Sequence, residues 1–284
     1  MRAIYVVLIG ASLVAAASNL RAAQIAFDSA GDSAYNNFNN LVTPYPNGGY
    51  GWGGPWQGAL RFGSSSSNGF GDPQSTGDIN SPRTPLGRAW ELSYVPNPDW
   101  RATNTISRPF SGALAPGQSI SLDLDTGDVA PINPSSQQIQ GFVLGQSTSI
   151  FQSFLETGIK FAADPMDGYS NYVVANDVGK FDTGIPLTDR GVHVAVTVID
   201  ASTVQVSVTS LAPGGASTSL ILPYSVPLTT VTVINDEIGP DPDNPNLFFN
   251  NVAITPEPAS ATFLVISVVV AALGRGRQTR YRGS

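Results

Sequence analysis

The 284-residue sequence contains no cysteine, which excludes disulfide bonds, thiolate metal sites and thiol catalysis. Histidine is nearly absent too, with His193 alone in the chain, and a lone histidine meets neither the usual zinc spacings nor the conditions of a catalytic triad. Charged residues make up 12% of the sequence, about half of the roughly 25% typical of soluble domains. Stability must therefore come from apolar burial, under a surface of mainly neutral polar residues.

The charge balance is acidic, with 21 acidic against 14 basic residues and a formal net charge of −7. Six arginines lie near the two ends of the chain, at positions 2, 21, 275, 277, 280 and 282. The part between them is consequently more acidic than the total. An acidic surface repels nucleic acid and anionic lipid, and favours cations or neutral partners, so nucleic-acid binding is not expected.

A hydrophobic segment of signal-peptide length opens the sequence. Met1 and Arg2 precede an apolar run over residues 3–17, and small residues follow it, which is the order of a secretory signal peptide. Residues 24–28 already alternate like a strand, which favours cleavage around Ala22 and Ala23 over cleavage directly after the apolar run. We predict a helical signal peptide over residues 1–23.

A second apolar segment lies at the C-terminal end. Pro256-Glu257-Pro258 precedes an apolar run over residues 261–273, and Arg275 and Arg277 begin a cluster of arginines. A hydrophobic segment closed by basic residues stops in the membrane with those residues in the cytoplasm. The run is near or below the roughly 17 to 25 residues that span a bilayer, so length alone leaves a buried core helix open, but the apolar residues do not form an amphipathic stripe. We predict a single transmembrane helix.

This order of motifs resembles the PEP-CTERM sorting signal of Gram-negative bacteria that secrete polysaccharide. In that signal a Pro-Glu-Pro motif, one membrane segment and an Arg-rich tail are read by an exosortase. The resemblance implies a sorting segment over residues 256–284, an exosortase as partner, and a protein anchored or released at the cell surface. Its motif residues here are Pro256, Glu257, Pro258, Arg275 and Arg277.

The body of the chain, residues 24–255, has a dominant period of two. Valines occupy every second position over residues 192–198 and again over 204–208, which predicts a hairpin with one buried face. Residues 90–94 and 120–124 alternate in the same way. Further strands are expected over residues 24–28, 102–108, 139–144, 150–155, 171–176, 219–222, 229–235 and 247–254.

Half-buried strands separated by polar turns, without a convincing amphipathic helix between them, call for two packed antiparallel sheets. We predict one all-β domain, an antiparallel β-sandwich of jelly-roll or lectin-like type, whose first and last strands pair at one edge. Ala26-Phe27-Asp28-Ser29 and the segment 48–56 (GGYGWGGPW) also resemble ectodomains common among PEP-CTERM proteins. That resemblance implies a lectin-like sandwich outside the cell, with no particular ligand.

Aromatic residues of the glycine-rich segment are candidates for sugar binding. Tyr50, Trp52 and Trp56 could offer flat faces to sugar rings, with nearby asparagines such as Asn47 as hydrogen-bonding partners. The alternative is that both tryptophans fill the core at one end of the sandwich. Their burial distinguishes the two interpretations.

Two acidic clusters have the oxygen ligands that calcium prefers. In the Pro-rich segment 236–246, predicted as a loop, the candidates are Asp236, Glu237, Asp241 and Asp243. A second cluster contains Asp123, Asp125 and Asp128. Neither has EF-hand spacing, and a solvated acidic loop is the alternative for both.

No active-site signature is present. Glycosidases need two carboxylates across a cleft, and the sequence offers Glu91 and Glu156 without a means of pairing them. His193 lies on a predicted strand with no nucleophile near it in sequence. The predicted function is a non-enzymatic, exosortase-sorted surface or matrix protein that associates with extracellular polysaccharide. A structural matrix protein without a ligand and a carbohydrate-active enzyme remain the alternatives.

Overall fold

The computed structural model describes residues 24–35, 47–61, 68–69, 89–92, 101–126, 137–145, 158–163, 170–188, 190–238 and 247–256. The chain divides into two units, Ile25–Ile254 and the terminal segments Met1–Gln24 with Thr255–Ser284, and the fold below is that of the first. The predicted signal peptide and the sorting segment from Glu257 onward lie outside the described residues. Among the residues that are described, no helix is both long enough and apolar enough to cross a bilayer.

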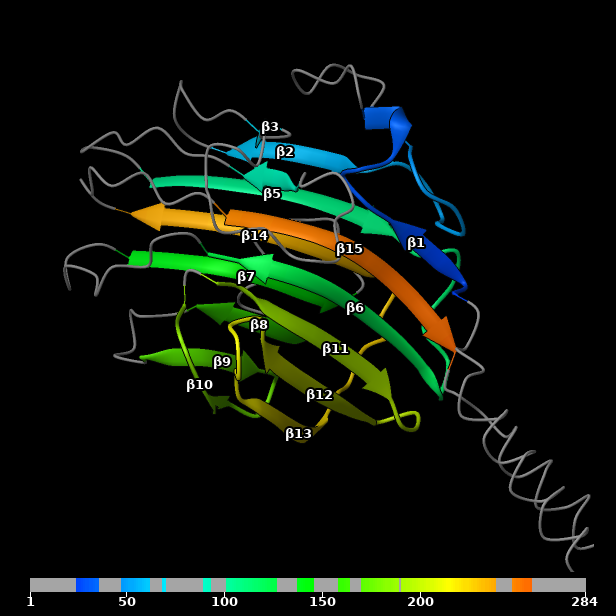
Figure 1. The fold of residues 1–284 in the computed structure, drawn as a ribbon. Coiled ribbons are helices and arrows are strands. Elements are labelled where there is room, and N and C mark those ends of the chain that lie inside the picture. The colour runs from blue at the N-terminus through cyan, green and yellow to red at the C-terminus, as the bar shows by residue number, and fades with distance from the viewer. Residues whose placement is uncertain are drawn as a thin grey trace, which may run out of the picture. The chain divides into compact units, whose positions relative to one another are not determined.

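Two antiparallel sheets form the first unit, which confirms the predicted β-sandwich (Figure 1). In the first sheet the strand order is β13-β12-β11-β6-β15-β4-β3, and β1 pairs with β15. Its strands are β1 (Ala26–Asp28), β3 (Asn68–Gly69), β4 (Trp90–Leu92), β6 (Gln118–Asp125), β11 (Val192–Val198), β12 (Thr203–Ser210), β13 (Ser217–Pro223) and β15 (Leu247–Pro256).

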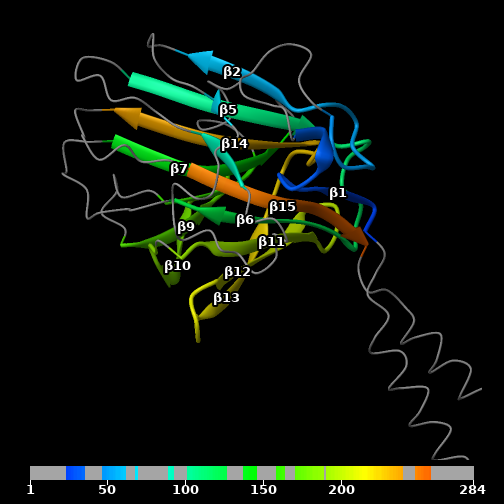
Figure 2. The same cartoon turned by 45° about the horizontal axis from the view of Figure 1, so that its top comes forward.

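The second sheet has the order β10-β9-β8-β7-β14-β5-β2. Its strands are β2 (Gln57–Arg61), β5 (Arg101–Pro109), β7 (Gln137–Gly145), β8 (Ile159–Ala163), β9 (Asn171–Ala175), β10 (Lys180–Pro186) and β14 (Thr230–Ile238). A single turn of 3-10 helix, η1 (Ser33–Tyr35), follows β1. The turned view in Figure 2 shows β15, β6 and β11 in one layer, with β5, β14 and β7 in the other.

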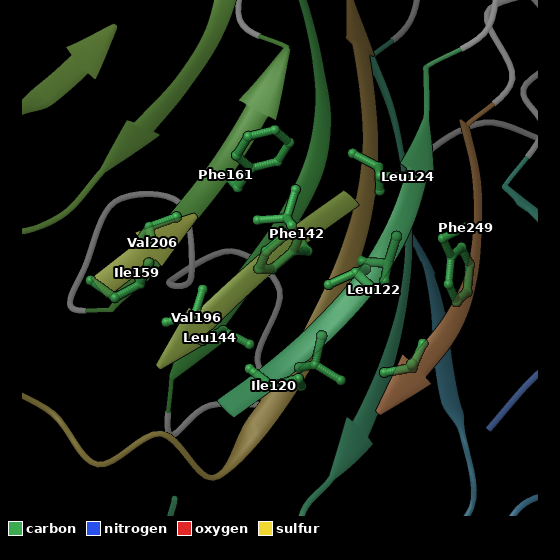
Figure 3. Packing of buried hydrophobic residues seen from close by; sticks show 14 of the residues in the cluster. Ile120, Leu122, Leu124, Phe142, Leu144, Ile159, Phe161, Val196, Val206 and Phe249 are labelled. Atoms are coloured by element: carbon green, nitrogen blue, oxygen red, sulfur yellow. The ribbon is translucent and has the colours of Figure 1, made fainter. Parts of the chain in front are cut away.

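The core lies between the two layers. In the β11–β12 hairpin every valine is fully buried and the residues between them are partly exposed, as the alternation predicted. Ile120, Leu122 and Leu124 of β6 belong to the same cluster as Phe142 and Leu144 of β7 (Figure 3). The period of two thus sorts side chains between core and surface along these strands.

The ends of the domain also meet as predicted. Residues 26–28 pair with residues 252–254 in antiparallel register. The sequence did not predict β2, β3, β8 and β10. In β10, a register shift between Asp182 and Pro186, with Gly184 at φ 68°, interrupts the strand pattern. The predicted strand 150–155 lies outside the described residues.

Candidate functional site

Trp56 is a core residue and not a sugar-binding one. Its side chain is 0% exposed, and its ring lies 5.4 Å from that of Trp90 and 5.5 Å from that of Phe249. Its indole Nε1 donates a hydrogen bond of 2.7 Å to Asp28 Oδ2. Because neither ring face is open, the sugar-binding prediction is wrong for Trp56, and core burial describes it.

Trp52 covers a buried arginine. The guanidinium carbon of Arg108 lies 4.8 Å from the centroid of the Trp52 ring and 5.4 Å from that of Trp56, within the range of a cation–π interaction. The Phe110 ring lies 6.0 Å from Trp52. Trp52 is half-buried, and its ring packs on the guanidinium group of Arg108.

Arg108 and Asp28 form the centre of a buried polar cluster. Asp28 Oδ2 accepts hydrogen bonds from Tyr35 at 2.8 Å and from Trp56, and forms an ion pair with Arg108 Nη1. Arg108 Nη2 donates to Asn47 Oδ1 and to the Gly48 carbonyl, both at 2.8 Å. The side-chain oxygen of Asn47 therefore binds this arginine. Burial raises the pKa of the Tyr35 hydroxyl, so Tyr35 remains a donor to the carboxylate.

The glycines of segment 48–56 let this cluster form. Gly49 and Gly51 have φ of 70° and 80°, the left-handed region that favours glycine. A Cβ atom at Gly49 would lie 2.1 Å from the Phe27 carbonyl oxygen, and one at Gly51 would lie 2.1 Å from that of Ile25. The segment therefore lies directly against the backbone of β1, and glycine at these two positions allows that close approach.

Tyr50 is the aromatic residue of this segment that stays open, with 52% of its surface exposed. Its backbone exchanges two hydrogen bonds with Phe27, at 3.0 and 3.1 Å, and Phe27 pairs with Ala253 of β15. The neighbours Ala26 and Ile254 point into the core. Because side chains alternate between the two faces of a strand, Phe27, Ala253 and Tyr50 belong to the outer face of the first sheet.

The same outer face carries rows of mainly neutral polar residues where it crosses β6, β11, β12 and β13. In each row the residues are direct cross-strand neighbours, and Thr197, Gln205 and Ser219 are examples. Hydroxyl and amide groups dominate, and most of these side chains are partly or fully exposed. The rows are Ser119-Thr197-Gln205-Ile221, Ser121-Ala195-Ser207-Ser219 and Asp123-His193-Thr209-Ser217.

Hydrogen bonds link these side chains across the strands. Ser119 and Thr197 share a bond of 2.6 Å between hydroxyl oxygens, and Gln205 Nε2 donates to the Ser219 hydroxyl at 2.7 Å. On the outer face of the second sheet, Ser107 and Thr232 are only 3% and 2% exposed. Of the two outer faces, the first sheet's is therefore the one that presents half-exposed hydroxyls to a partner.

A buried asparagine pair interrupts β15 beside this face. Leu247 and Phe249 belong to the core, and so do Val252 and Ile254, so the alternation shifts by one residue between them. Asn251 has φ 53°, the one positive value among the described non-glycine residues. This is a β-bulge, which re-aims side chains next to it.

The bulge directs Asn251 toward Asp123. Asn251 Nδ2 donates to Asp123 Oδ2 at 2.7 Å, and His193 Nδ1 lies 2.6 Å from Asp123 Oδ1. Both oxygens of this carboxylate are engaged, and Asp123 is 3% exposed. A hollow of about 10 Å³ beside it, lined by Asp125, Arg190 and Asn250 among others, has room for about one water molecule. The arrangement fixes His193 in place and contains no nucleophile of a triad.

Part of the segment predicted as a calcium-binding loop is a strand. Asp236 and Glu237 are part of β14, paired with residues of both β5 and β7, so their backbone is in the sheet and the prediction of a loop there is wrong. Asp241, Asp243 and Asp128 lie outside the described residues. In the described part of the chain, no group of three or more acidic or histidine side chains is placed to hold a metal ion.

The carboxylates proposed for an enzyme are placed only in part. Glu91 lies on β4 opposite Phe248 of β15 and Gly69 of β3, and burial raises its pKa. Glu156 lies outside the described residues. Sequence reasoning missed Arg108, Asn250 and Asn251, since the paired neighbours that explain them are distant in the chain.

The sequence matches no protein-family model and no curated protein. Among solved structures, it is similar to a legume lectin-like domain from Entamoeba histolytica, with 8% identity and a TM-score of 0.39 over 58% of this chain and 82% of that one. The botulinum neurotoxin serotype G binding domain has 11% identity and a TM-score of 0.42, over 88% of this chain and 51% of that domain, so the chain spans about half its length. A carbohydrate esterase from the Shiga toxin-encoding bacteriophage phi24B has 13% identity and a TM-score of 0.44, over 83% and 100%.

Proposed function

We propose that this protein is an exported, non-enzymatic surface protein that associates with extracellular polysaccharide through the outer face of its first sheet. The observation that carries the proposal is the composition of that face, which presents rows of hydroxyl and amide side chains and, beyond β15, the exposed ring of Tyr50. Hydroxyl groups both donate and accept hydrogen bonds, which suits the hydroxyls of a sugar. An aromatic ring with a polar group adds an apolar contact.

The charge of the protein supports a neutral partner or a cation-bridged one. The net charge is −7, which opposes acidic polymers unless salt or a cation screens it. Asp123 is the one acidic residue of the outer-face rows, and its side chain is buried. A neutral polysaccharide is therefore the ligand class that this face fits.

Delivery to the surface is the second half of the proposal. Residues 1–23 act as a signal peptide and residues 256–284 as an exosortase-read sorting segment with a membrane helix, as the order of sequence motifs indicates. Strand β15 ends at Pro256, the first residue of the Pro-Glu-Pro motif. The sorting segment would thus follow the last strand without an intervening linker.

Affinity electrophoresis of the full chain through gels that contain a neutral polysaccharide tests the binding. The pair Gln205→Ala with Ser207→Ala should reduce the retardation, and Tyr50→Ala should reduce it as well. Ser111→Ala is the matched control, since Ser111 is an exposed serine outside the rows. Equal retardation of all variants would contradict binding at this face, and no retardation of the wild type would favour a matrix protein without a ligand.

Two additions to this experiment separate the remaining alternatives. Repeating the gels with calcium and with a chelator tests whether Asp241 and Asp243 contribute through a bound cation. Incubating the chain with polysaccharide and following new reducing ends tests the enzyme alternative. Product formation that Glu91→Gln abolishes would overturn the non-enzymatic assignment.

A further inference from the structure

Strand β13 forms one border of the first sheet. It pairs with β12 through every residue from Ser217 to Pro223, and the sheet ends there (Figure 1). Ser217, Ser219 and Ile221, whose side chains lie on the outer face of the sheet, are exposed. An edge strand of this kind presents unpaired backbone groups to any chain that can add to the sheet.

The register identifies which groups point outward. Ser210 N donates to the Ala216 carbonyl at 2.9 Å, directly opposite in the β12–β13 register. In an antiparallel pair, hydrogen-bonded and non-hydrogen-bonded positions alternate, so Thr218, Leu220 and Leu222 bond to β12. The N–H and C=O groups of Ser217, Ser219 and Ile221 therefore point away from the sheet.

The strand lacks the features that normally protect an edge. It contains no charged residue, and its register with β12 is unbroken. Strand β10, the corresponding edge of the second sheet, carries Lys180 and Asp182 and has a shifted register before Pro186. Charges and irregularities of that kind block edge pairing, so β13 is the more receptive of these two edges.

The open stretch has defined ends. At one end, the Pro223 carbonyl accepts a hydrogen bond of 2.9 Å from Asn176 Nδ2, and proline has no N–H to donate. At the other end, residues 211–216 form a turn in which Gly215 N donates to the Ala212 carbonyl. The backbone N–H and C=O groups that remain available at this edge are therefore those of Ser217, Ser219 and Ile221. Ser219 is the middle residue of this set, with one such residue two positions away on each side.

We propose that β13 pairs with β13 of a second copy of this chain, antiparallel and about a two-fold axis at Ser219. In this register Ser219 faces its own equivalent and Ser217 faces Ile221, so every outward group finds a partner. The absence of charge on the strand avoids repulsion between identical copies. The two most exposed large apolar residues described, Val178 at 72% and Ile221 at 68%, lie at this border, Val178 in the turn whose Asn176 binds Pro223.

Disulfide trapping with the full chain tests the register. The protein has no cysteine, so a single introduced thiol can bond only to its equivalent in another copy. Ser219→Cys places the two Cα atoms about 5.5 Å apart across the axis, a distance that a disulfide spans. We expect mild oxidation to give a covalent dimer at least about tenfold faster than for the control, because the control separates its thiols.

Ser217→Cys is that control, since it introduces the same thiol on the same face of the same strand. In the proposed register its two copies are four residues apart along the strand, about 13 Å, which no disulfide spans. A mixture of Ser217→Cys and Ile221→Cys chains should form the mixed disulfide in preference to either homodimer. Equal rates for Ser219→Cys and Ser217→Cys would overturn the proposal and favour a different extended chain as the partner of this edge.

Sedimentation velocity supplies an independent measurement. Ser219→Lys places two like charges directly opposite each other across the axis, which opposes pairing, and should shift the wild-type dimer to a monomer. Thr209→Lys on β12 is the matched control, because it adds the same charge to the same face away from the edge. A wild-type chain that stays monomeric at its highest soluble concentration would also overturn the proposal.

Discussion

Asp28 and Arg108 form an ion pair with side chains that are 0% and 1% exposed. The pair joins β1, which opens the domain, to β5 of the opposite sheet. Tyr35, Trp56 and the Gly48 carbonyl complete the hydrogen bonding around it. A buried charge pair is tolerated when its remaining donors and acceptors are satisfied, and here the glycine-rich segment supplies many of those partners.

Arg108→Met should destabilise the fold by about 3 to 5 kcal/mol, because it leaves the Asp28 carboxylate buried without its countercharge. Urea denaturation followed by tryptophan fluorescence measures the loss. Lys180→Met is the control, since Lys180 is exposed and should change stability by no more than about 0.5 kcal/mol. Loss of less than about 1 kcal/mol in Arg108→Met would contradict the structural role of the cluster.

Because Asn251 lies in the bulge of β15, glycine and alanine at this position should differ in stability in the opposite sense from an ordinary strand position. Its φ of 53° suits glycine, whereas alanine pays about 1 to 2 kcal/mol for that conformation. Both changes remove the hydrogen bond to Asp123, so Asn251→Gly should be more stable than Asn251→Ala in thermal denaturation. At an ordinary strand position glycine is the weaker of the two, and that order at residue 251 would rule out the bulge.

The half-buried carboxyl group of Glu91 should make the stability of the fold depend on pH. Burial raises its pKa, so the protonated form is favoured in the folded state. Its contribution to stability is complete below the unfolded pKa near 4.5 and is lost as the pH rises through the folded value. Glu91→Gln should therefore raise the urea midpoint at pH 7 and leave it nearly unchanged at pH 4. An equal gain at both pH values would show that Glu91 ionisation is not its cause.

Alternation was enough to predict the hairpin of β11 and β12, because each valine faces the core and each neighbour faces solvent. The tendency of a domain's ends to lie close together predicted the pairing of the first and last strands. Alternation could not predict β10, where Gly184 and a register shift break the pattern. Nor could it distinguish Trp56 from Tyr50, since a long-range partner, Asp28, decides that one is buried while the other remains exposed.

The buried polar cluster around Asp28 and Arg108 could not be predicted from the sequence either, because its partners are also distant in the chain. Nothing near Arg108 in sequence marks it as buried, and the partners of its guanidinium group lie 52 to 80 positions away, from Trp56 to Asp28. The asparagines of the bulge read as an ordinary continuation of a strand. Both features depend on tertiary neighbours, which a single sequence does not specify.

The sorting proposal predicts the fate of truncated protein. Deleting residues 256–284 should send the chain to the medium or periplasm instead of the envelope fraction, because the membrane segment and its arginines are gone. Glu257→Ala should block processing of the full chain while leaving the apolar segment intact. Cell fractionation with immunoblotting measures both, and unchanged fractionation and processing in the two variants would count against exosortase sorting.

Amide chemical-shift mapping with a neutral oligosaccharide that binds the full chain shows which face of the sandwich contacts the sugar. We expect the shifts to concentrate on the outer-face rows of β11, β12 and β13 and at Tyr50, and we expect Gln205→Ala with Ser207→Ala to weaken them. Residues of the second sheet such as Lys160 and Thr183 should remain unchanged. Shifts confined to the second sheet, with none along β11 to β13, would contradict binding at the outer face of the first sheet.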